Sequence, residues 1–197
     1  MLKWEKSMVY NALDISKHIL EYVYNNYPDN QNDVTNLKMQ KLLYYAQALY
    51  LVDYNKKPLF EDEIQAWKWG PVVPSAYEAY SEYGNKVIFL DKEKLEDKKQ
   101  LDIESKEYLE SFIPEFMEYL AHCLVNMSHI DSPWREAWNQ GWGYGAIIPK
   151  DSMYDFYKEK ENGEDEILAK IADNIDDGRN VKRLTSEKFW ERALGNN

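Results

Sequence analysis

The stretch that most constrains the fold runs from Asn36 to Tyr54 and reads NLKMQKLLYYAQALYLVDY. Apolar residues recur in it at three- and four-residue spacing, which is the pattern of a helix with a buried face. Thr35 or Asn36 can accept a hydrogen bond from the free N–H groups of its first turn. We expect this helix to lie at the centre of a helical core. Its buried stripe would consist of Met39, Leu42, Leu43, Ala46, Leu49 and Tyr50.

Other helical patterns flank this central one. They cover residues 12–27, 74–83, 105–127, 132–138 and 150–160. The sequence therefore predicts a mainly α fold, a compact helical domain with at most a small β-hairpin around a Trp-Gly-Pro motif. The polar run after about residue 160 marks a boundary. We expect a helical domain over residues 1–160 and a helical extension over residues 161–197, packed on the domain or facing a partner.

The charge balance limits the kinds of partner. There are 24 Lys and Arg residues against 35 Asp and Glu, a net charge of −11. This argues against nucleic acid, whose binding requires basic surfaces, and favours a basic protein. A single cysteine, Cys123, excludes an internal disulfide and a multi-cysteine zinc site. Since no apolar run is long enough to span a bilayer and no signal peptide is apparent, we expect no membrane association and a cytoplasmic location.

The segment AWKWGPVVPSAYEAY, residues 66–80, concentrates aromatic side chains around a glycine and two prolines. We read it as a short strand that runs into Gly70 and Pro71 and then into a helix begun by Pro74. On such a strand Trp67 and Trp69 would share one face, with one indole buried and one at the rim. The VIFL segment, residues 87–90, is a possible second strand paired with the tryptophan segment.

Catalytic and metal-binding patterns are weak. None of the three histidines forms an HExxH pair, and neither a GxGxxG motif nor a P-loop occurs. We therefore predict no catalytic residue, no metal and no cofactor. Lys38 and Lys41 lie three residues apart on the central helix, and we interpret them as edge lysines, either solvated or facing a partner.

Three ordered segments together resemble one family. The signature helix of this family resembles the segment TNLKMQKLLYYAQALYL. The central motif of the family resembles PLFEDEIQAWKWGPVVPSAYEAYSEYG, and a later histidine followed by Pro-Trp resembles SHIDSPWREAW. This is the Panacea-domain family, also called SocA-like or GepA-like, which is often carried on phages and mobile elements. The resemblance covers roughly residues 10–157. Ser128 stands where the family has Thr and Met39 where it has Leu, and the tail after about residue 160 has no counterpart.

The resemblance implies an antitoxin of a toxin–antitoxin system that neutralises a cognate protein toxin by direct binding. It also implies a possible role as an adaptor to a ClpXP-type protease. The acidic charge of the chain favours a basic toxin. Two alternatives stay open: an enzyme using small molecules or a metal, with a pocket under the aromatic segment and His129, and a less favoured DNA-binding autoregulator. We expect structural roles for Gly70, Pro71, Pro74, Gly84, His129, Pro133 and Trp134. The candidate partner-binding residues are Lys38, Lys41, Tyr45, Trp67, Lys68, Trp69, Val72, Tyr77 and Tyr80.

Overall fold

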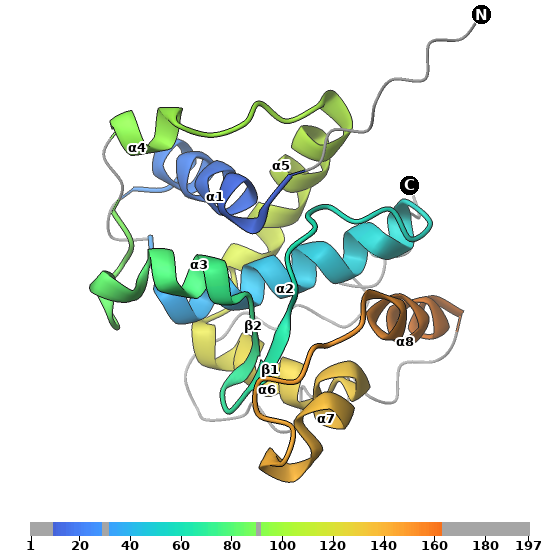
Figure 1. Cartoon of the computed structure of the whole chain (residues 1–197). Coiled ribbons are helices and arrows are strands. Elements are labelled where there is room, and N and C mark those ends of the chain that lie inside the picture. Colours follow the sequence, from blue (N-terminus) through green and yellow to red (C-terminus); the bar gives the residue numbers. More distant parts are fainter. Residues whose placement is uncertain (1–9, 29–31, 90–91, 163–197) are drawn as a thin grey trace, which may run out of the picture.

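The computed structural model describes residues 10–28, 32–89 and 92–162. As predicted, this part of the chain is mainly helical with one small antiparallel hairpin (Figure 1). The first half contains α1 (Ala12–Asn26), α2 (Asn36–Asp53), β1 (Gln65–Trp67), β2 (Gly70–Val72), α3 (Pro74–Ala79) and the 3-10 turn η1 (Ser81–Tyr83). The second half contains α4 (Lys92–Glu96), α5 (Ile103–Met117), α6 (Ala121–Ile130), α7 (Ser132–Trp138), the 3-10 turn η2 (Asn139–Gly141) and α8 (Lys150–Asn162).

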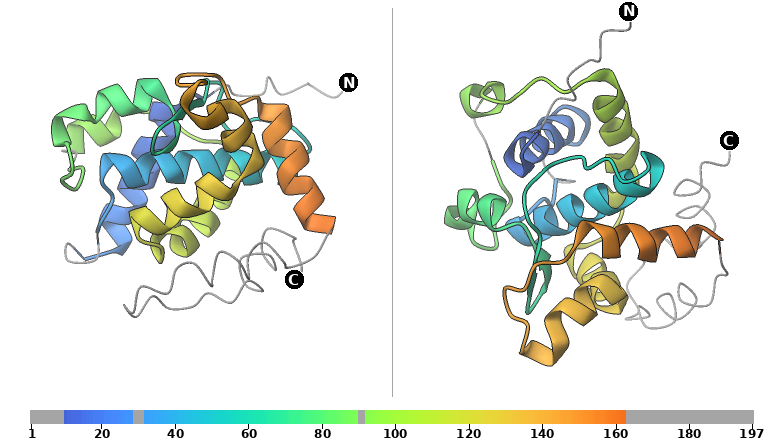
Figure 2. Two further views of the ribbon diagram at one scale, coloured as in Figure 1. Left: turned by 90° about the horizontal axis from the view of Figure 1, so that it is seen from below. Right: turned by 45° about the vertical axis from the view of Figure 1, so that its right-hand side comes forward.

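Helix α2 runs through the middle of the molecule, and α1, α5, α6 and α8 all contact it (Figure 2). The predicted stripe from Met39 to Tyr50 is buried, as is most of the rest of the helix. Thr35 is the N-cap, and its hydroxyl accepts from the Lys38 N–H at 3.3 Å. A helix buried on nearly all sides has no polar face for its polar residues to occupy.

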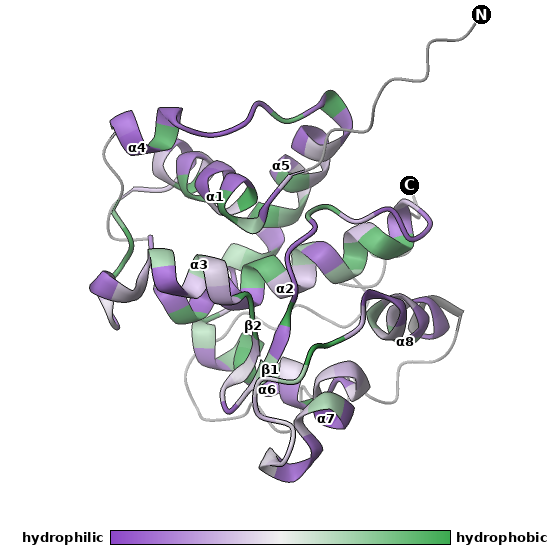
Figure 3. Ribbon diagram, viewed as in Figure 1, coloured by the Kyte–Doolittle hydropathy of each residue, from purple (hydrophilic) through white to green (hydrophobic). Residues whose placement is uncertain are grey.

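Buried polar side chains of α2 instead bond to the backbone of the segment that follows the helix. Figure 3 shows hydrophilic residues interspersed with apolar ones along α2. Gln47 accepts from the N–H groups of Leu59 and Phe60 at 3.0 and 3.1 Å, and it donates to the Phe60 carbonyl. Gln40 accepts from the Val73 N–H at 2.9 Å. Because a buried polar group without a partner is costly, these bonds make the buried amides compatible with the core.

Lys38 and Lys41 belong to the same buried set, so the expectation of solvent-exposed edge lysines is wrong. Both side chains are fully buried. Lys38 donates to Asp33 at 2.5 Å and to the Met117 carbonyl at 3.2 Å. Lys41 donates to the Pro71 carbonyl at 2.8 Å. The sequence pattern placed them at an edge because lysine is rarely buried, but α2 has no exposed edge at these positions.

The hairpin differs in detail from the predicted strand. β1 ends at Trp67, and Lys68 and Trp69 form the turn, so the two tryptophans do not share a strand face. Residues 87–89, the described part of the VIFL segment, do not pair with the tryptophan segment, since Val87 bridges Thr35. Residues 145–148 bond to β1 instead. The Ala66 N–H donates to the Ala146 carbonyl and the Gly145 N–H donates to the Ala66 carbonyl, both at 2.8 Å. The register of the hairpin is Gln65↔Val72, Ala66↔Pro71 and Trp67↔Gly70.

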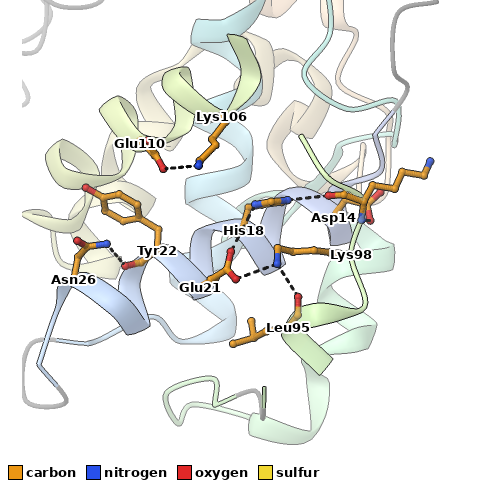
Figure 4. A network of polar contacts seen from close by, with 10 residues as sticks. Asp14, His18, Glu21, Tyr22, Asn26, Leu95, Lys98, Lys106 and Glu110 are labelled. Carbon is orange, nitrogen blue, oxygen red and sulfur yellow. Dashed lines mark hydrogen bonds and ion pairs between the residues drawn. The ribbon is translucent and has the colours of Figure 1, made fainter. Parts of the chain in front are cut away.

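Helix α1 is tied to the segment around α4 by polar contacts (Figure 4). Lys98 donates to Glu21 at 3.1 Å and to the Leu95 carbonyl at 2.9 Å. Nε2 of His18 lies 2.9 Å from the Lys99 carbonyl oxygen. Burial lowers the pKa of His18. This side of the molecule is thus held by ordinary structural contacts.

Helix α8 is the last element of the described chain and includes the predicted domain boundary at residue 160. Helix α8 packs on α2 through buried Met153 and Tyr157. The predicted extension, residues 161–197, falls outside the described residues beyond Asn162, so the boundary at residue 160 stays a prediction. In the part of the chain that is described, no helix is long and apolar enough to cross a membrane.

Candidate partner-binding face

A continuous series of aromatic rings runs from the hairpin to α6. The Trp67 ring lies 5.0 Å from Tyr77 of α3 and 5.6 Å from Tyr144. Tyr144 lies 6.3 Å from Trp138, and Trp138 stacks at 5.7 Å on Trp134, both in α7. The series ends where Trp134 stacks on His129 at 4.2 Å. We call these six residues the aromatic row: Tyr77, Trp67, Tyr144, Trp138, Trp134 and His129.

The outer members of the row are exposed, together with neighbours from the same two loops. Tyr144 is 62% exposed, whereas Trp134 at the inner end is 6% exposed. The hairpin turn adds Trp69, 61% exposed, and the loop after η2 adds Trp142, 89% exposed. Figure 1 places the hairpin turn and η2 at the same end of the molecule. Large apolar side chains gathered at the surface are typical of interaction sites. The aromatic face comprises Trp67, Trp69, Tyr77, Trp142, Tyr144 and Ile147.

Gly70 lets the hairpin lie close to the core. Its φ is +95°, in the region that favours glycine. A Cβ at this position would lie 2.5 Å from both Lys41 Nζ and Ser128 Oγ, too close for either to stay in place. The Trp134 indole N–H also donates to the Trp67 carbonyl at 3.1 Å. The glycine therefore lets β2 lie against α2 and α6, and the indole ties β1 to α7, so the row depends on both contacts.

Two titratable groups lie beneath the hairpin. Burial lowers the pKa of Lys41 well below 10.5, and no carboxylate forms an ion pair with it among the described residues. The pKa of His129 is lowered by burial and then by the charge of Lys41, while the Lys68 backbone raises it. The buried Nε2 of His129 has no hydrogen-bond partner in the described structure. Burial thus disfavours the charged form of both groups.

A second buried cluster joins α2 to α8. Tyr157 donates a hydrogen bond to Asp131, and Tyr45 packs edge-on against Tyr157 at 6.5 Å. Burial and the charge of Asp131 raise the pKa of Tyr44, Tyr45 and Tyr157 well above 10.0. Tyr45 is therefore part of the interior.

The structure separates the candidate partner-binding residues into two groups. Those at the surface or partly exposed are Trp67, Lys68, Trp69 and Tyr77. Those with buried side chains are Lys38, Lys41, Tyr45, Val72 and Tyr80. Within the second group, Lys41 bonds to the hairpin through the Pro71 carbonyl. Contact with a partner stays a prediction for all nine.

The motif residues that we expected to be structural take the following positions. Pro71 is buried in β2, and Pro74 lies in the first turn of α3. Gly84 follows η1 with φ +56°. Pro133 lies in the first turn of α7, although the N-cap is Asp131 and not Ser132. Trp134 is buried, and His129 stacks on it as described above.

The sequence does not predict the contribution of the loop after η2 to the aromatic face. The loop reads GWGYG, residues 141–145, and nothing local in this sequence indicates that it lies beside Trp67. Its position depends on the bonds between residues 145–148 and β1, which are far apart in the chain. The same part of the molecule offers no metal site, since the described residues contain no group of three or more His, Cys, Asp or Glu that could hold an ion.

Residues 39–135 match the family model described as antitoxin SocA-like, Panacea domain. The matched region begins in α2 and ends in α7, so it includes the hairpin and α3. Over these residues the chain is similar to the SocA-like antitoxin family, which confirms the resemblance over a narrower range than residues 10–157.

One individual relative can be named. The antitoxin SocA of Caulobacter vibrioides (strain NA1000 / CB15N) is 46% identical to this chain over 55 residues. The aligned region covers 28% of this chain and 29% of the relative, so the chain matches less than a third of that protein's length. No solved structure matches the chain.

Proposed function

We propose that this chain is the antitoxin of a toxin–antitoxin pair and neutralises a protein toxin by binding it directly through the aromatic face. The observation that carries the proposal is the placement of exposed Trp69 and Tyr77 and partly exposed Trp67 within the region that matches the antitoxin family. Tyr and Trp are enriched among residues that dominate binding energy, because they bury a large area and lose few rotamers.

The rigidity of the face supports this proposal. Its rings are carried by elements fixed to the core through Gly70, Trp134 and the bonds of residues 145–148. A surface that is already ordered loses less entropy on association than a flexible one. The inner rings of the row would therefore hold the outer rings in place for contact.

The proposed activity requires no catalytic residue and no cofactor. Similarity to an antitoxin family favours such a binding role over an enzyme with a pocket near His129. The adaptor role toward a ClpXP-type protease, which the resemblance implied, stays a prediction, because none of the described contacts bears on it.

A growth-rescue experiment tests the proposed function. The product of the neighbouring reading frame is expressed until growth stops, and this chain is then co-expressed. We expect the wild type to restore growth and the double variant Trp69→Ser/Trp142→Ser to restore it at least about tenfold less well in colony counts, since both indoles are exposed and their loss leaves the fold intact.

The matched control replaces exposed apolar residues away from the face, as Tyr24→Ser/Ile103→Ser, which are 50% and 77% exposed. We expect this variant to rescue growth as the wild type does. Failure of the wild type to rescue would contradict the antitoxin function. Equal rescue by both double variants would contradict the assignment of the face.

A further inference from the structure

The aromatic face contains a cation–π contact within the chain itself. The ammonium group of Lys68 lies 5.2 Å from the centroid of the Trp69 ring, within the range of a cation–π contact. Lys68 comes from the same turn and is exposed, so an incoming cation can compete with it for the ring. The exposed rings of Tyr77, Trp142 and Tyr144 offer further surfaces of the same kind.

Two exposed carboxylates lie in the segments that carry the face. Glu63 lies two residues before β1, in a stretch where Ile64 and Ala66 are buried and Glu63, Gln65 and Trp67 are exposed or partly exposed. Glu78 is exposed and follows Tyr77 in α3. Neither Glu63 nor Glu78 forms an ion pair within the described structure. Both carboxylates are therefore unpaired among the described residues and lie in segments that also carry rings of the face.

We propose that the segment of the partner seated on this face is apolar and carries arginine or lysine. This inference rests on the proposed function and specifies the chemistry of the toxin surface. A guanidinium group can stack on an indole and bond to a carboxylate at the same time, so arginine suits the arrangement best. An acidic segment or a phosphate backbone would be repelled by Glu63 and Glu78, and by the chain's net charge of −11.

Binding of peptide probes to the purified full chain tests this inference without the toxin. The probes are amphipathic helical peptides with the same leucine pattern, in which every polar position is Arg, Gln or Glu. Binding is followed by anisotropy of a label on the peptide at physiological salt. We expect the Arg peptide to bind at least about tenfold more tightly than the Gln peptide, and the Glu peptide to bind most weakly.

Matched variants separate the face from the overall charge of the chain. Glu63→Gln/Glu78→Gln should weaken binding of the Arg peptide at least about threefold more than Glu96→Gln/Glu107→Gln, which removes two exposed charges elsewhere. Lys68→Ala should strengthen binding more than Lys86→Ala, because it frees the Trp69 ring as well as removing a positive charge.

Equal binding of the Arg and Gln peptides, or equal effects within each pair of variants, would overturn the inference. Either result would leave the growth-rescue experiment unaffected. Conversely, selective binding of the Arg peptide together with failed rescue would contradict the antitoxin function and not the chemistry of the face.

Discussion

At the scale of single residues, the close packing of the hairpin on the core requires a glycine at position 70. Its positive φ and its closeness to Lys41 and Ser128 are two separate requirements. We expect Gly70→Ala to destabilise the fold by about 2–4 kcal/mol, because it adds backbone strain and displaces two buried side chains.

Gly84→Ala is the control for this substitution, since Gly84 also has a positive φ but a Cβ added there would meet no atom within 4 Å. It should cost about 1 kcal/mol, from strain alone. The measurement is urea unfolding of both variants, and equal losses would contradict the close contact of Gly70 with the core.

Lys41 gives the stability a dependence on pH. In the unfolded chain its ammonium group has the ordinary pKa of 10.5, whereas burial lowers the pKa in the folded protein. Between these two values the unfolded chain binds the extra proton, so the free energy of unfolding rises with pH, by at most about 1.4 kcal/mol per pH unit.

We expect Lys41→Met to remove this contribution and to give a smaller slope than the wild type as the pH rises toward 10.5. Urea unfolding over a series of pH values below 10.5 measures it. Lys68→Met, at an exposed position, should keep the wild-type slope. A Lys41→Met slope equal to that of the wild type would mean that the amine is not buried beneath the hairpin.

At the scale of elements, side chains of α2 hold the irregular segment that follows it through hydrogen bonds to its backbone. Gln47 satisfies the N–H groups of Leu59 and Phe60, which have no other means of bonding once they are buried. We expect Gln47→Leu to destabilise the protein by about 2–4 kcal/mol, because these groups lose their partner.

Gln100→Leu, at an exposed position, should change the stability by less than about 0.5 kcal/mol. Thermal or urea unfolding of the two variants measures the difference. If Gln47→Leu were as stable as Gln100→Leu, the segment after α2 would not depend on these hydrogen bonds.

The elements also show which parts of the fold could be predicted from the sequence. The stripe from Met39 to Tyr50, the cap at Thr35 and the helix start at Pro74 follow from short-range patterns, and all are present. The burial of Lys41 depends on a bond to Pro71 across 30 residues, and the place of Tyr144 on pairing with β1. Such contacts leave no local periodicity in the sequence. For this reason the sequence pattern placed Lys38 and Lys41 at an edge and did not indicate the position of the loop at residues 141–145.

At the scale of the whole molecule, the aromatic face and the contact between α1 and the segment around α4 differ in how their polar groups are paired. Around α1, polar groups such as Lys98 and Glu21 are paired with one another (Figure 4). At the face, rings are exposed and Glu63 and Glu78 have no ion-pair partner among the described residues. This asymmetry leads to the central claim, that the toxin binds at the hairpin and the loop after η2.

Hydrogen–deuterium exchange of the chain, alone and bound to the toxin, tests this claim most directly. We predict that binding slows exchange in residues 65–77 and 139–148 by about tenfold or more, because these amides lose solvent access or local opening. Exchange in α1 and α5 should change little. Slower exchange in α1 or α5, with residues 65–77 and 139–148 unchanged, would contradict the account.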